Sequence, residues 1–449
     1  MSLPRYPDYK DSGAGWLGAV PAHWDCLRLA VLFREVSEPG NDELPILSVS
    51  IHDGVSDKEL DDEAERKVSR SDDRSKYKAV APGDLTYNMM RAWQGGFGTV
   101  AVRGMVSPAY VVARPTARFF TSHVEMLLRT PMAVSEMKRY SRGITDFRLR
   151  LYWDDFKCLR IALPPYAEQV SIANFLERET AKIDALIAEQ EKLIALLAEK
   201  RQATISHAVT SGVNPDAPMK DSGVAWLAEV PAHWSVGKIQ SFARRESGHT
   251  PSRQHPEYWE NCTVPWFSLA DVWQIREGNR KFVYETKEMA SELGIANSSA
   301  RLLPAGTVML SRTASVGYSA IMGRDMATTQ DFINWVCGPL LKPEFLLYVL
   351  RGMRCEFDRL MMGSTHQTIY MPDAAKLMMT LPPLHEQAAI VAFLDDATAR
   401  LDALRDAAEL AVGLLKERRS ALIAAAVTGQ IDVRGAVTAP ADTREELIA

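Results

Sequence analysis

Residues 163–210 read LPPYAEQVSIANFLERETAKIDALIAEQEKLIALLAEKRQATISHAVT, and residues 381–428 read LPPLHEQAAIVAFLDDATARLDALRDAAELAVGLLKERRSALIAAAVT. The second stretch aligns with the first without a gap at a displacement of 218 residues, and nearly half of its positions are identical. A repeat of this period and quality predicts two equivalent halves.

Both stretches have the periodicity of long amphipathic helices. Apolar or small residues recur at steps of three, four or a multiple of seven, which places them on one side of a helix. The most economical way to bury both seams is against each other, so we predict an antiparallel coiled-coil pair. Helices packed inside a larger globule are the alternative. The predicted seams are Ile172, Leu176, Ile183, Leu186, Leu193, Leu197, Thr204 and Ala208 in the first helix and Ile390, Leu394, Ala397, Leu401, Leu404, Ala408, Ala411 and Leu415 in the second.

The ends of both helices are marked by residue type. Pro164 and Pro165 favour an extended entry followed by a first helical turn, and Glu168 places a carboxylate near the positive end of the helix dipole. Gly212 suits the residue after a helix end. At about 1.5 Å per residue each helix would be roughly 65 Å long, a spacer of fixed length. The second copy repeats these signals at Pro382, Pro383, Glu386 and Gly429.

The composition is that of a soluble protein with two or more globular domains. The chain has 449 residues, of which 47% are apolar and 24% are charged. Its five cysteines form no CxxC pair and no metal-ligand spacing, so we expect buried thiols in a reducing compartment. No secretory signal and no apolar run of the ~18 residues that span a membrane is visible, so we expect a cytoplasmic protein.

The net charge of −5 hides two local fields of opposite sign. Residues 35–73 hold 13 acidic and 4 basic side chains, whereas residues 74–160 hold 15 basic and 6 acidic ones. The first segment is typical of a solvated acidic face. The second segment favours a surface that binds phosphate groups.

A second repeat precedes each variable part of the chain. Residues 10–24, KDSGAGWLGAVPAHW, return as residues 220–234, KDSGVAWLAEVPAHW. The two histidines of these leaders, His23 and His233, each lie between Pro and Trp with no second metal ligand nearby. We interpret them as structural residues in a packed turn rather than as metal ligands or catalytic groups.

Between each leader and the following LPP lies a variable block, at residues 25–162 and 235–380. Short strand-like runs broken by Gly and Pro alternate with helical segments, so each block is predicted to be a compact α/β (α+β) domain. GDLTYNMMR (83–91) and GTVMLSR (306–312) each run a strand into an arginine, whereas the other polar residues differ. The predicted strands are 99–102, 110–113, 307–310 and 332–336, and the predicted helices are 123–140 and 343–361.

No catalytic motif accounts for the chain. Leu163-Pro-Pro-Tyr166 is superficially similar to the NPPY motif of amino-methyltransferases, but leucine cannot accept the hydrogen bonds of an amino group. No glycine-rich cofactor loop, phosphate loop or HExxH zinc motif occurs. We therefore expect a non-catalytic chain.

The chain resembles the specificity subunits of type I restriction–modification systems. The resemblance covers nearly the whole chain and is carried by the LPPxxEQ helix entries, the two helical repeats, the KDSG…WL…VPxHW leaders and the two dissimilar blocks. Phrases of the second block add to it, namely GHTPSRQHPEYWE (248–260), PWFSLADV (265–272), SRTASVG (311–317) and ATTQDF (327–332).

This resemblance implies a DNA reader with a pseudo-twofold internal repeat, in which two long antiparallel helices separate two target-recognition domains with curved β-sheets. Each domain would read one half of a bipartite, asymmetric site in double-stranded DNA. It implies the following division: residues 1–162, the first recognition domain; 163–212, the central helical spacer; 213–380, the second recognition domain; 381–430, the C-terminal helix that pairs with the central one; and 431–449, a flexible tail.

The resemblance also implies partners and their cofactors. Two modification subunits carrying S-adenosylmethionine would dock on the helices and methylate an adenine in each half-site. Restriction subunits, with ATP and Mg²⁺, would add cleavage, and this chain itself would hold no cofactor and no metal. The predicted partner-binding residues are Glu168, Gln169, Phe175, Glu386, Gln387 and Phe393, with the alanine-rich face at 421–427 as additional partner surface.

Discrimination between bases requires forked donors and amides, because Arg pairs with guanine and Asn or Gln with adenine. Phosphate contacts position a protein on DNA without specifying the sequence. The predicted base-reading residues are Arg91, Gln94, Arg148 and Arg150 in the first block and Arg253, Gln254, Arg312, Gln330, His366 and Gln367 in the second. The predicted phosphate contacts are Lys76, Lys78, Arg103, Arg142, Arg244, Arg245, Arg324 and Lys376.

Two other classes of function stay open at this point. A scaffold of two ligand-binding domains on a coiled-coil rod, without DNA binding, has the same periodicity. An enzyme would require S-adenosylmethionine binding or nuclease activity by the isolated chain, and the sequence offers no site for either.

Overall fold

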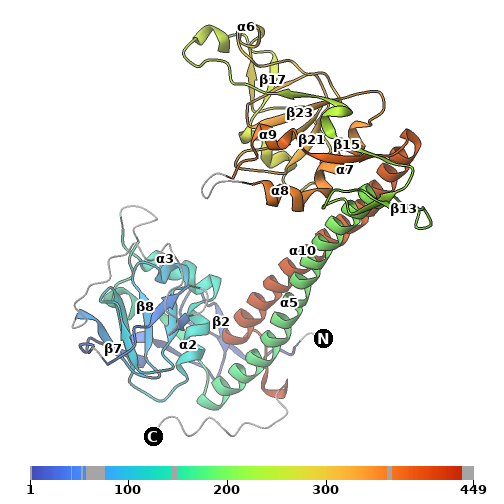
Figure 1. Cartoon of the computed structure of the whole chain (residues 1–449). Helices are drawn as coiled ribbons and strands as arrows, with labels where there is room; N and C mark the ends of the chain where they lie inside the picture. Colours follow the sequence, from blue (N-terminus) through green and yellow to red (C-terminus); the bar gives the residue numbers. More distant parts are fainter. Residues whose placement is uncertain are drawn as a thin grey trace. The chain divides into compact units, whose positions relative to one another are not determined.

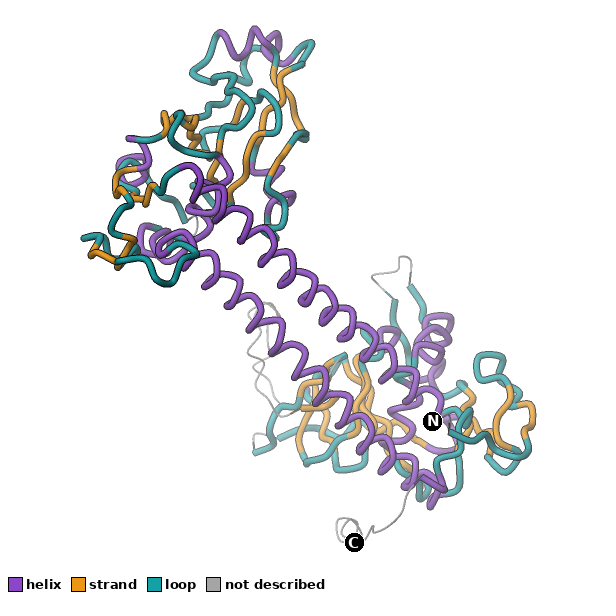
Figure 2. Tube along the Cα trace, turned by 90° about the vertical axis from the view of Figure 1, so that its right-hand side faces the viewer, coloured by secondary structure: helices purple, strands orange, loops and turns teal. Residues whose placement is uncertain are grey.

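The computed structural model describes residues 3–41, 43–51, 54–56, 76–143, 149–361 and 367–436. The chain divides into two compact units, the first formed by residues 1–189 and 412–449 and the second by residues 190–411. The two long helices, α5 (Tyr166–Ser211) and α10 (Leu384–Val427), each contribute to both units. Within each unit they are antiparallel and lie side by side (Figure 2).

The seam between the helices differs from the predicted one by one residue in its central part. Leu186, Leu193 and Leu404 are 46%, 42% and 56% exposed, so their assignment to the seam was wrong. The less exposed positions of α5 are instead Ile187, Gln190 and Ile194. One residue corresponds to a rotation of about 100° around the helix, which is enough to turn a side chain from the partner helix to solvent. The predicted seam residues that are buried are Ile172, Leu176, Ile183, Leu197, Ala208, Ile390, Leu394, Leu401 and Ala408.

An ion pair joins the two helices in each unit. In the first unit Arg419 Nε donates to Asp184 Oδ1 at 2.8 Å, and in the second unit Arg201 Nε donates to Asp402 Oδ1 at 3.0 Å. The four residues are related by the 218-residue displacement of the sequence repeat. The repeat therefore extends to individual contacts.

The block of the first unit is built on a four-stranded antiparallel sheet (Figure 1). Its strand order is β4 (Phe33–Val36), β11 (Tyr110–Pro115), β8 (Leu85–Asn88) and β9 (Phe97–Thr99), so the strand predicted at 99–102 lies earlier in the chain. Helix α2 (Thr121–Leu128) packs against β9, and α3 (Pro131–Tyr140) follows it. The helix predicted over 123–140 is thus two helices, because Thr130 caps α3 and Pro131 lies in its first turn. Two-stranded pairs complete the block, β5 (Ser48–Ser50) with β6 (Gly54–Ser56) and β7 (Lys78–Val80) with β10 (Gly104–Val106).

The block of the second unit has a larger sheet. Its five strands follow the order β16 (Ala243–Ser247), β23 (Phe332–Cys337), β20 (Val308–Ser311), β21 (Ser319–Met322) and β18 (Phe282–Val283). The predicted helix over 343–361 is also two helices, α7 (Pro343–Gly352) and α8 (Arg354–Leu360). A Cβ at Gly352 would approach Val209 of α5 to 2.9 Å, so glycine allows the end of α7 to pack on α5. A three-stranded sheet completes the block, in the order β19 (Glu288–Ala290), β17 (Val264–Phe267), β22 (Ala327–Thr328).

The two ends of each block are joined in a short antiparallel ribbon. In the first unit β3 (Asp25–Arg28) pairs with β12 (Arg160–Leu163), and in the second β15 (Ser235–Lys238) pairs with β24 (Met378–Leu381). The residue that follows the leader therefore lies opposite the leucine of LPP in both units. Because its ends are adjacent, each block leaves and re-enters the rest of its unit at one place.

Each leader forms a hairpin whose tryptophan packs against the end of a long helix. The hairpins are β1 (Tyr9–Asp11) with β2 (Ala19–Pro21), and β13 (Met219–Asp221) with β14 (Glu229–Pro231). Trp24 and Trp234 are buried. A Cβ at Gly429, after α10, would lie 3.1 Å from the Trp24 ring, and one at Gly212, after α5, would lie 3.1 Å from the Trp234 ring. Both glycines have a positive φ, which ends the helix and also keeps this approach free of a side chain.

A carboxylate at the start of each long helix holds the leader. Glu168 is buried and accepts hydrogen bonds from His23 Nε2 at 2.7 Å and Trp24 Nε1 at 3.0 Å, as well as from the Tyr6 hydroxyl. Glu386 accepts the equivalent bonds from His233 at 2.7 Å and Trp234 at 2.9 Å. The leader histidines therefore bind a carboxylate, and no group of three potential metal ligands occurs among the described residues.

The glutamine that follows each carboxylate holds the block. Gln169 Oε1 accepts from the backbone N–H of Phe120, and Gln169 Nε2 donates to Pro164 O, both at 2.8 Å. Gln387 Oε1 accepts from the N–H of Lys342 at 2.9 Å, and its Nε2 donates to the carbonyls of Leu340 and Pro382 at 2.8 Å. The residues Phe120 and Lys342 immediately precede α2 and α7, so each glutamine fixes the start of a block helix.

These contacts correct part of the predicted partner surface. Glu168, Gln169, Phe175 and Gln387 are buried inside their own units, so they have no surface to offer a partner. Their polar groups are already satisfied by the leader and the block. Glu386, whose side chain is 30% exposed, and Phe393, which is 46% exposed, remain predictions.

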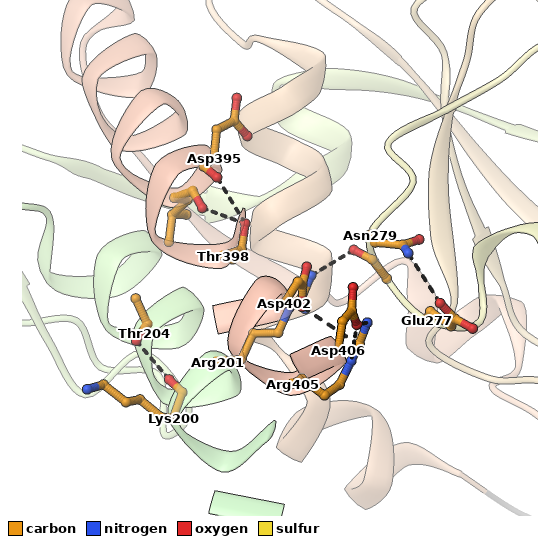
Figure 3. Close-up of polar contacts among 12 residues, drawn as sticks. Lys200, Arg201, Thr204, Glu277, Asn279, Asp395, Thr398, Asp402, Arg405 and Asp406 are labelled. Carbon is orange, nitrogen blue, oxygen red and sulfur yellow. Dashed lines mark hydrogen bonds and ion pairs between the residues drawn. The ribbon is translucent and has the colours of Figure 1, made fainter. Parts of the chain in front are cut away.

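In the second unit a loop at residues 276–281 covers the ion pair between the helices (Figure 3). Arg201 Nη2 donates to Gly278 O at 2.8 Å, and Lys281 Nζ lies 2.8 Å from both carboxylate oxygens of Asp395. Arg351 Nη2 donates to Arg280 O at 2.7 Å, and burial lowers the pKa of Arg351 to about 10. The loop thus fastens the second block to both long helices.

We predict that replacing Gln387 with alanine loosens the joint between the second block and α10. The N–H of Lys342 and the carbonyl of Leu340 would lose their buried partner, and an unsatisfied buried group costs about 1–3 kcal/mol. Hydrogen exchange at residues 340–346 should become about tenfold faster or more, measured by mass spectrometry on the full chain. Gln254→Ala, at an exposed position, is the control, and equal protection in both variants would contradict the assignment.

A second prediction concerns His123, which is fully buried beside Trp24 and whose ring nitrogens have no partner among the described residues. Burial lowers the pKa of His123 to about 4. The unfolded chain therefore binds this proton below about pH 6.5, whereas the folded chain does not until about pH 4. The free energy of unfolding of the first unit should fall as the pH is lowered through this window, by at most about 1.4 kcal/mol per pH unit for this group.

Denaturant unfolding of wild type and His123→Leu at pH 7 and pH 5 tests this prediction. The leucine variant should lose about 2 kcal/mol less between these pH values. His385→Leu, at a largely exposed position, should keep the wild-type pH dependence. Identical pH dependence in all three proteins would exclude a role for His123.

Candidate nucleic-acid interface

Three loops of the second block meet at the end of strand β20. The N–H of Arg312 donates to Asp331 O at 2.8 Å, the N–H of Ile369 donates to Arg312 O at 2.9 Å, and the N–H of Ala314 donates to Gln367 O at 3.0 Å. The structure thus brings together three predicted base-reading residues, Arg312, Gln330 and Gln367. We call the surface formed by residues 248–254, 312–314, 328–331 and 367–369 the recognition edge.

Arg312 joins the loops of the recognition edge from within. Its Nε donates to Gln330 O at 2.9 Å, and its Nη1 lies 3.4 Å from Ile369 O. These bonds use part of the guanidinium fork on main-chain carbonyls. The structure therefore gives Arg312 a positioning role, and its role in reading a base stays a prediction.

Gln330 and Gln367 are exposed at this edge. Gln330 Oε1 accepts a hydrogen bond from the Thr250 hydroxyl at 2.8 Å. Thr250 was not predicted as a site residue, because a threonine between a histidine and a proline carries no signal of such a contact in the sequence. His366 lies outside the described residues.

Arg253 is held on two tryptophans beside the edge. Its guanidinium lies 4.0 Å from the centroid of the Trp259 ring and 5.8 Å from that of Trp266, and its Nη2 donates to Glu288 at 2.7 Å. Stacking on an indole and pairing with a carboxylate restrict its orientation. Gln254 is exposed next to it.

The other predicted residues of the second block are surface side chains. Arg245 Nη1 donates to Met371 O at 3.2 Å, so it helps to hold the short helix α9 (Met371–Ala374). Arg244 pairs with Glu246 at 3.0 Å and Lys376 pairs with Asp373 at 3.0 Å, and Arg324 is exposed. All four remain predicted phosphate contacts.

The equivalent edge of the first block has a different register from the one expected. Asn88 pairs with Tyr110 as Ser311 pairs with Phe332, and the N–H of Leu151 donates to Met89 O as that of Ile369 does to Arg312 O. Met89, and not Arg91, therefore corresponds to Arg312. The predicted parallel between GDLTYNMMR and GTVMLSR is correct in its strand and wrong by two residues at its end.

Arg91 and Gln94 are exposed on either side of Trp93, near a short 3-10 turn (Ala92–Gln94). Trp93 Nε1 donates to Met90 O at 2.9 Å, and Lys138 Nζ lies 5.8 Å from the ring centroid of Trp93. The Trp93 ring thus lies in the chain between the two predicted base-reading residues and is fixed by these contacts.

The remaining predicted residues of the first block are dispersed. Arg142 and Arg150 exchange two backbone hydrogen bonds of 2.9 Å, and the Arg142 guanidinium pairs with Asp155. Lys78 Nζ donates to Tyr110 O at 2.7 Å, which indicates a structural role. Lys76 and Arg103 are exposed, and Arg148 lies outside the described residues.

Two tyrosines occupy the same place in both blocks and were not predicted. Tyr152 precedes α4 (Trp153–Phe156) and Tyr370 precedes α9, with exposed fractions of 42% and 56%. They are separated by the same 218 residues as the helical repeat. Extending the repeat upstream of LPP would have identified them.

Residues 231–410 match the family model described as the type I restriction modification DNA specificity domain. A specificity subunit of the type I restriction enzyme MjaIX from Methanocaldococcus jannaschii is 26% identical over 177 residues, which are 38% of this chain and 40% of that relative. The chain is thus similar to the specificity subunits of type I restriction–modification systems. The alignment spans less than half of the length of that relative.

Two solved structures from type I restriction–modification systems share the fold. A chain solved in work on complex assembly and conformational transition of the type I restriction–modification system is 19% identical, with a TM-score of 0.64 over 91% of this chain and 98% of that one. The HsdS subunit from Thermoanaerobacter tengcongensis is 18% identical, with a TM-score of 0.52 at the same coverage. In the described part of the chain, no helix has the length and apolar character of a membrane span.

We predict that Arg312→Met loosens the recognition edge of this chain without unfolding its sheet. The side chain contributes two hydrogen bonds to loop carbonyls, each worth about 0.5–1.5 kcal/mol. Hydrogen exchange at residues 327–331 and 367–371 should rise about 3- to 10-fold, while β20 and β23 stay protected. Arg324→Met is the control, and unchanged exchange in both loops would contradict the positioning role.

Proposed function

We propose that this chain is the sequence-specific DNA-binding subunit of a type I restriction–modification complex and has no catalytic centre of its own. The observation that carries the proposal is that the two units share one frame, made of leader, ribbon and helix entry, while the recognition edges of their blocks differ. Leader, ribbon and helix entry are equivalent in the two units, whereas corresponding edge positions hold Met89 in the first block and Arg312 in the second. A frame that is constant around a variable edge suits two domains that read different DNA sequences.

The residue types at the two edges support DNA as the ligand. Arginine and glutamine side chains supply the forked donors and amides that recognise base edges, and exposed Lys and Arg side chains supply phosphate contacts. Each block would read one half of a bipartite, asymmetric site in double-stranded DNA. The predicted division into two recognition domains, two long helices and a C-terminal tail belongs to this proposal.

The long helices are the proposed docking elements for the modification subunits. Exposed apolar side chains support this role, among them Leu186 and Leu414 in the first unit and Leu193, Phe393 and Leu410 in the second. Two modification subunits would bring S-adenosylmethionine and methylate one adenine in each half-site, after flipping it from the duplex. Restriction subunits would bring ATP and Mg²⁺, and the complex would act in the cytoplasm.

Methylation mapping tests the proposal directly. DNA from cells that express this chain with its candidate modification subunit should carry methylated adenines on both strands of one bipartite motif, detected by single-molecule sequencing. Exchange of residues 25–162 for the corresponding block of another family member should change one half of the motif and leave the other half unchanged.

The control for mapping is the modification subunit expressed without this chain, which should leave the motif unmethylated. If an active modification subunit together with this chain yields no bipartite motif, the DNA-reading role fails for that pair. The alternative, a scaffold of two ligand-binding domains that does not bind DNA, would then be favoured.

A further inference from the structure

In the loop at residues 327–331 the side chain of Gln330 is exposed, whereas its neighbours are held by hydrogen bonds. Thr328 and Thr329 are buried and Gln330 is exposed. Thr328 Oγ1 accepts from Asn334 Nδ2 at 2.9 Å, and Thr329 Oγ1 lies 3.0 Å from a carboxylate oxygen of Asp331. The backbone is also held on both sides of Gln330, since the N–H of Thr329 donates to Phe267 O at 3.0 Å and Asp331 O accepts from the N–H of Arg312 at 2.8 Å. Gln330 is thus the apex of a loop whose neighbouring side chains point inward or to each other.

A second segment is brought against this loop by a glycine. A Cβ at Gly248 would lie 2.1 Å from Thr329 O and 2.2 Å from Thr328 Oγ1, so no other residue fits there without moving the main chain. The N–H of His249 donates to Thr328 O at 3.0 Å, and Trp266 Nε1 donates to His249 O at 3.1 Å. This close approach carries Thr250 to the side chain of Gln330.

The Thr250 hydroxyl fixes the amide of Gln330. Its hydroxyl donates to Gln330 Oε1 at 2.8 Å, and Arg312 holds the main-chain carbonyl of the same residue at 2.9 Å. A carbonyl oxygen has two acceptor positions, so Oε1 keeps one of them, and Gln330 Nε2 has no partner among the described residues. One acceptor and a pair of donors are left side by side and facing away from the fold.

We propose that Gln330 is the base-reading residue of the second recognition domain, that it reads the adenine of an A·T base pair in the major groove, and that Thr250 and Arg312 position it. An amide pairs with adenine by donating from Nε2 to N7 and accepting at Oε1 from the 6-amino group. Fixing the amide before binding removes part of the entropic cost of ordering the side chain. Arg253, by contrast, already donates one of its hydrogen bonds to Glu288.

This inference rests on the proposed DNA-reading function, and its test uses the full chain in complex with the modification subunit. Methylation mapping and binding to duplexes with single base-pair changes in each half-site are compared for wild type, Gln330→Ala, Thr250→Val and Thr250→Ser. Gln240→Ala, an exposed glutamine of the second block outside the recognition edge, is the matched control. A wild-type complex that yields no bipartite motif would overturn the proposed function, whereas the outcomes below concern Gln330 alone.

In the Gln330→Ala complex, discrimination at one A·T pair of the second half-site should fall about 10-fold or more, with every position of the first half-site unchanged. Thr250→Val, which keeps the shape and removes the donor, should relax the same base pair, and Thr250→Ser should keep wild-type discrimination. Relaxation at the same base pair in Gln330→Ala and Thr250→Val would show that Thr250 positions Gln330. A general loss of folding would instead weaken binding to all sequences.

Two outcomes overturn the inference. One is unchanged discrimination at every base pair in Gln330→Ala. The other is an equal loss of affinity for all duplexes, which would make Gln330 a phosphate contact. If Gln330→Ala does not fold, Thr250→Val decides alone, because relaxation at no single A·T pair in that variant contradicts the proposed role.

Discussion

A glutamate–glutamine pair at the start of each long helix is the contact on which the rest of the structure depends. The glutamate binds the indole and imidazole of the leader, and the glutamine binds the start of a block helix. The groups that the block contributes are main-chain atoms, such as the N–H of Phe120 and Lys342 and the carbonyl of Leu340. The joint therefore places no demand on the side chains of the block, and the sheet residues can differ while the frame stays the same.

Most of the frame could be predicted from the sequence, because the repeat and the helix-end residues are local signals. The two long helices, their antiparallel pairing and their starts directly after LPP were all predicted. The seam was misplaced by one residue at Leu186 and Leu193, because leucine occurs on more than one face of this helix and periodicity alone does not choose between them. The burial of Glu168, which was predicted to bind a partner, escaped the sequence analysis for a related reason. The sequence shows a carboxylate near a helix start but not the indole N–H of Trp24, which comes from 144 residues away.

The recognition edge could be predicted only in part from the sequence. Three predicted readers of the second block, Arg312, Gln330 and Gln367, lie together. Their roles depend on main-chain carbonyls and a threonine hydroxyl supplied by loops far apart in the sequence, which residue type and spacing do not reveal. The same limit explains the register error between Arg91 and Arg312, because strand pairing and not motif length determines which positions correspond.

The two ion pairs between the long helices are chemically the same but differ in their exposure to solvent. The side chains of Arg419 and Asp184 are 41% and 50% exposed, whereas those of Arg201 and Asp402 are 17% and 18% exposed beneath the 276–281 loop. At 0.1 M salt the screening length is about 10 Å, and mobile counter-ions weaken interactions between exposed charges far more than those between covered ones. Ionic strength therefore acts unequally on these two equivalent contacts, weakening the contact between the helices in the first unit while leaving that in the second largely intact.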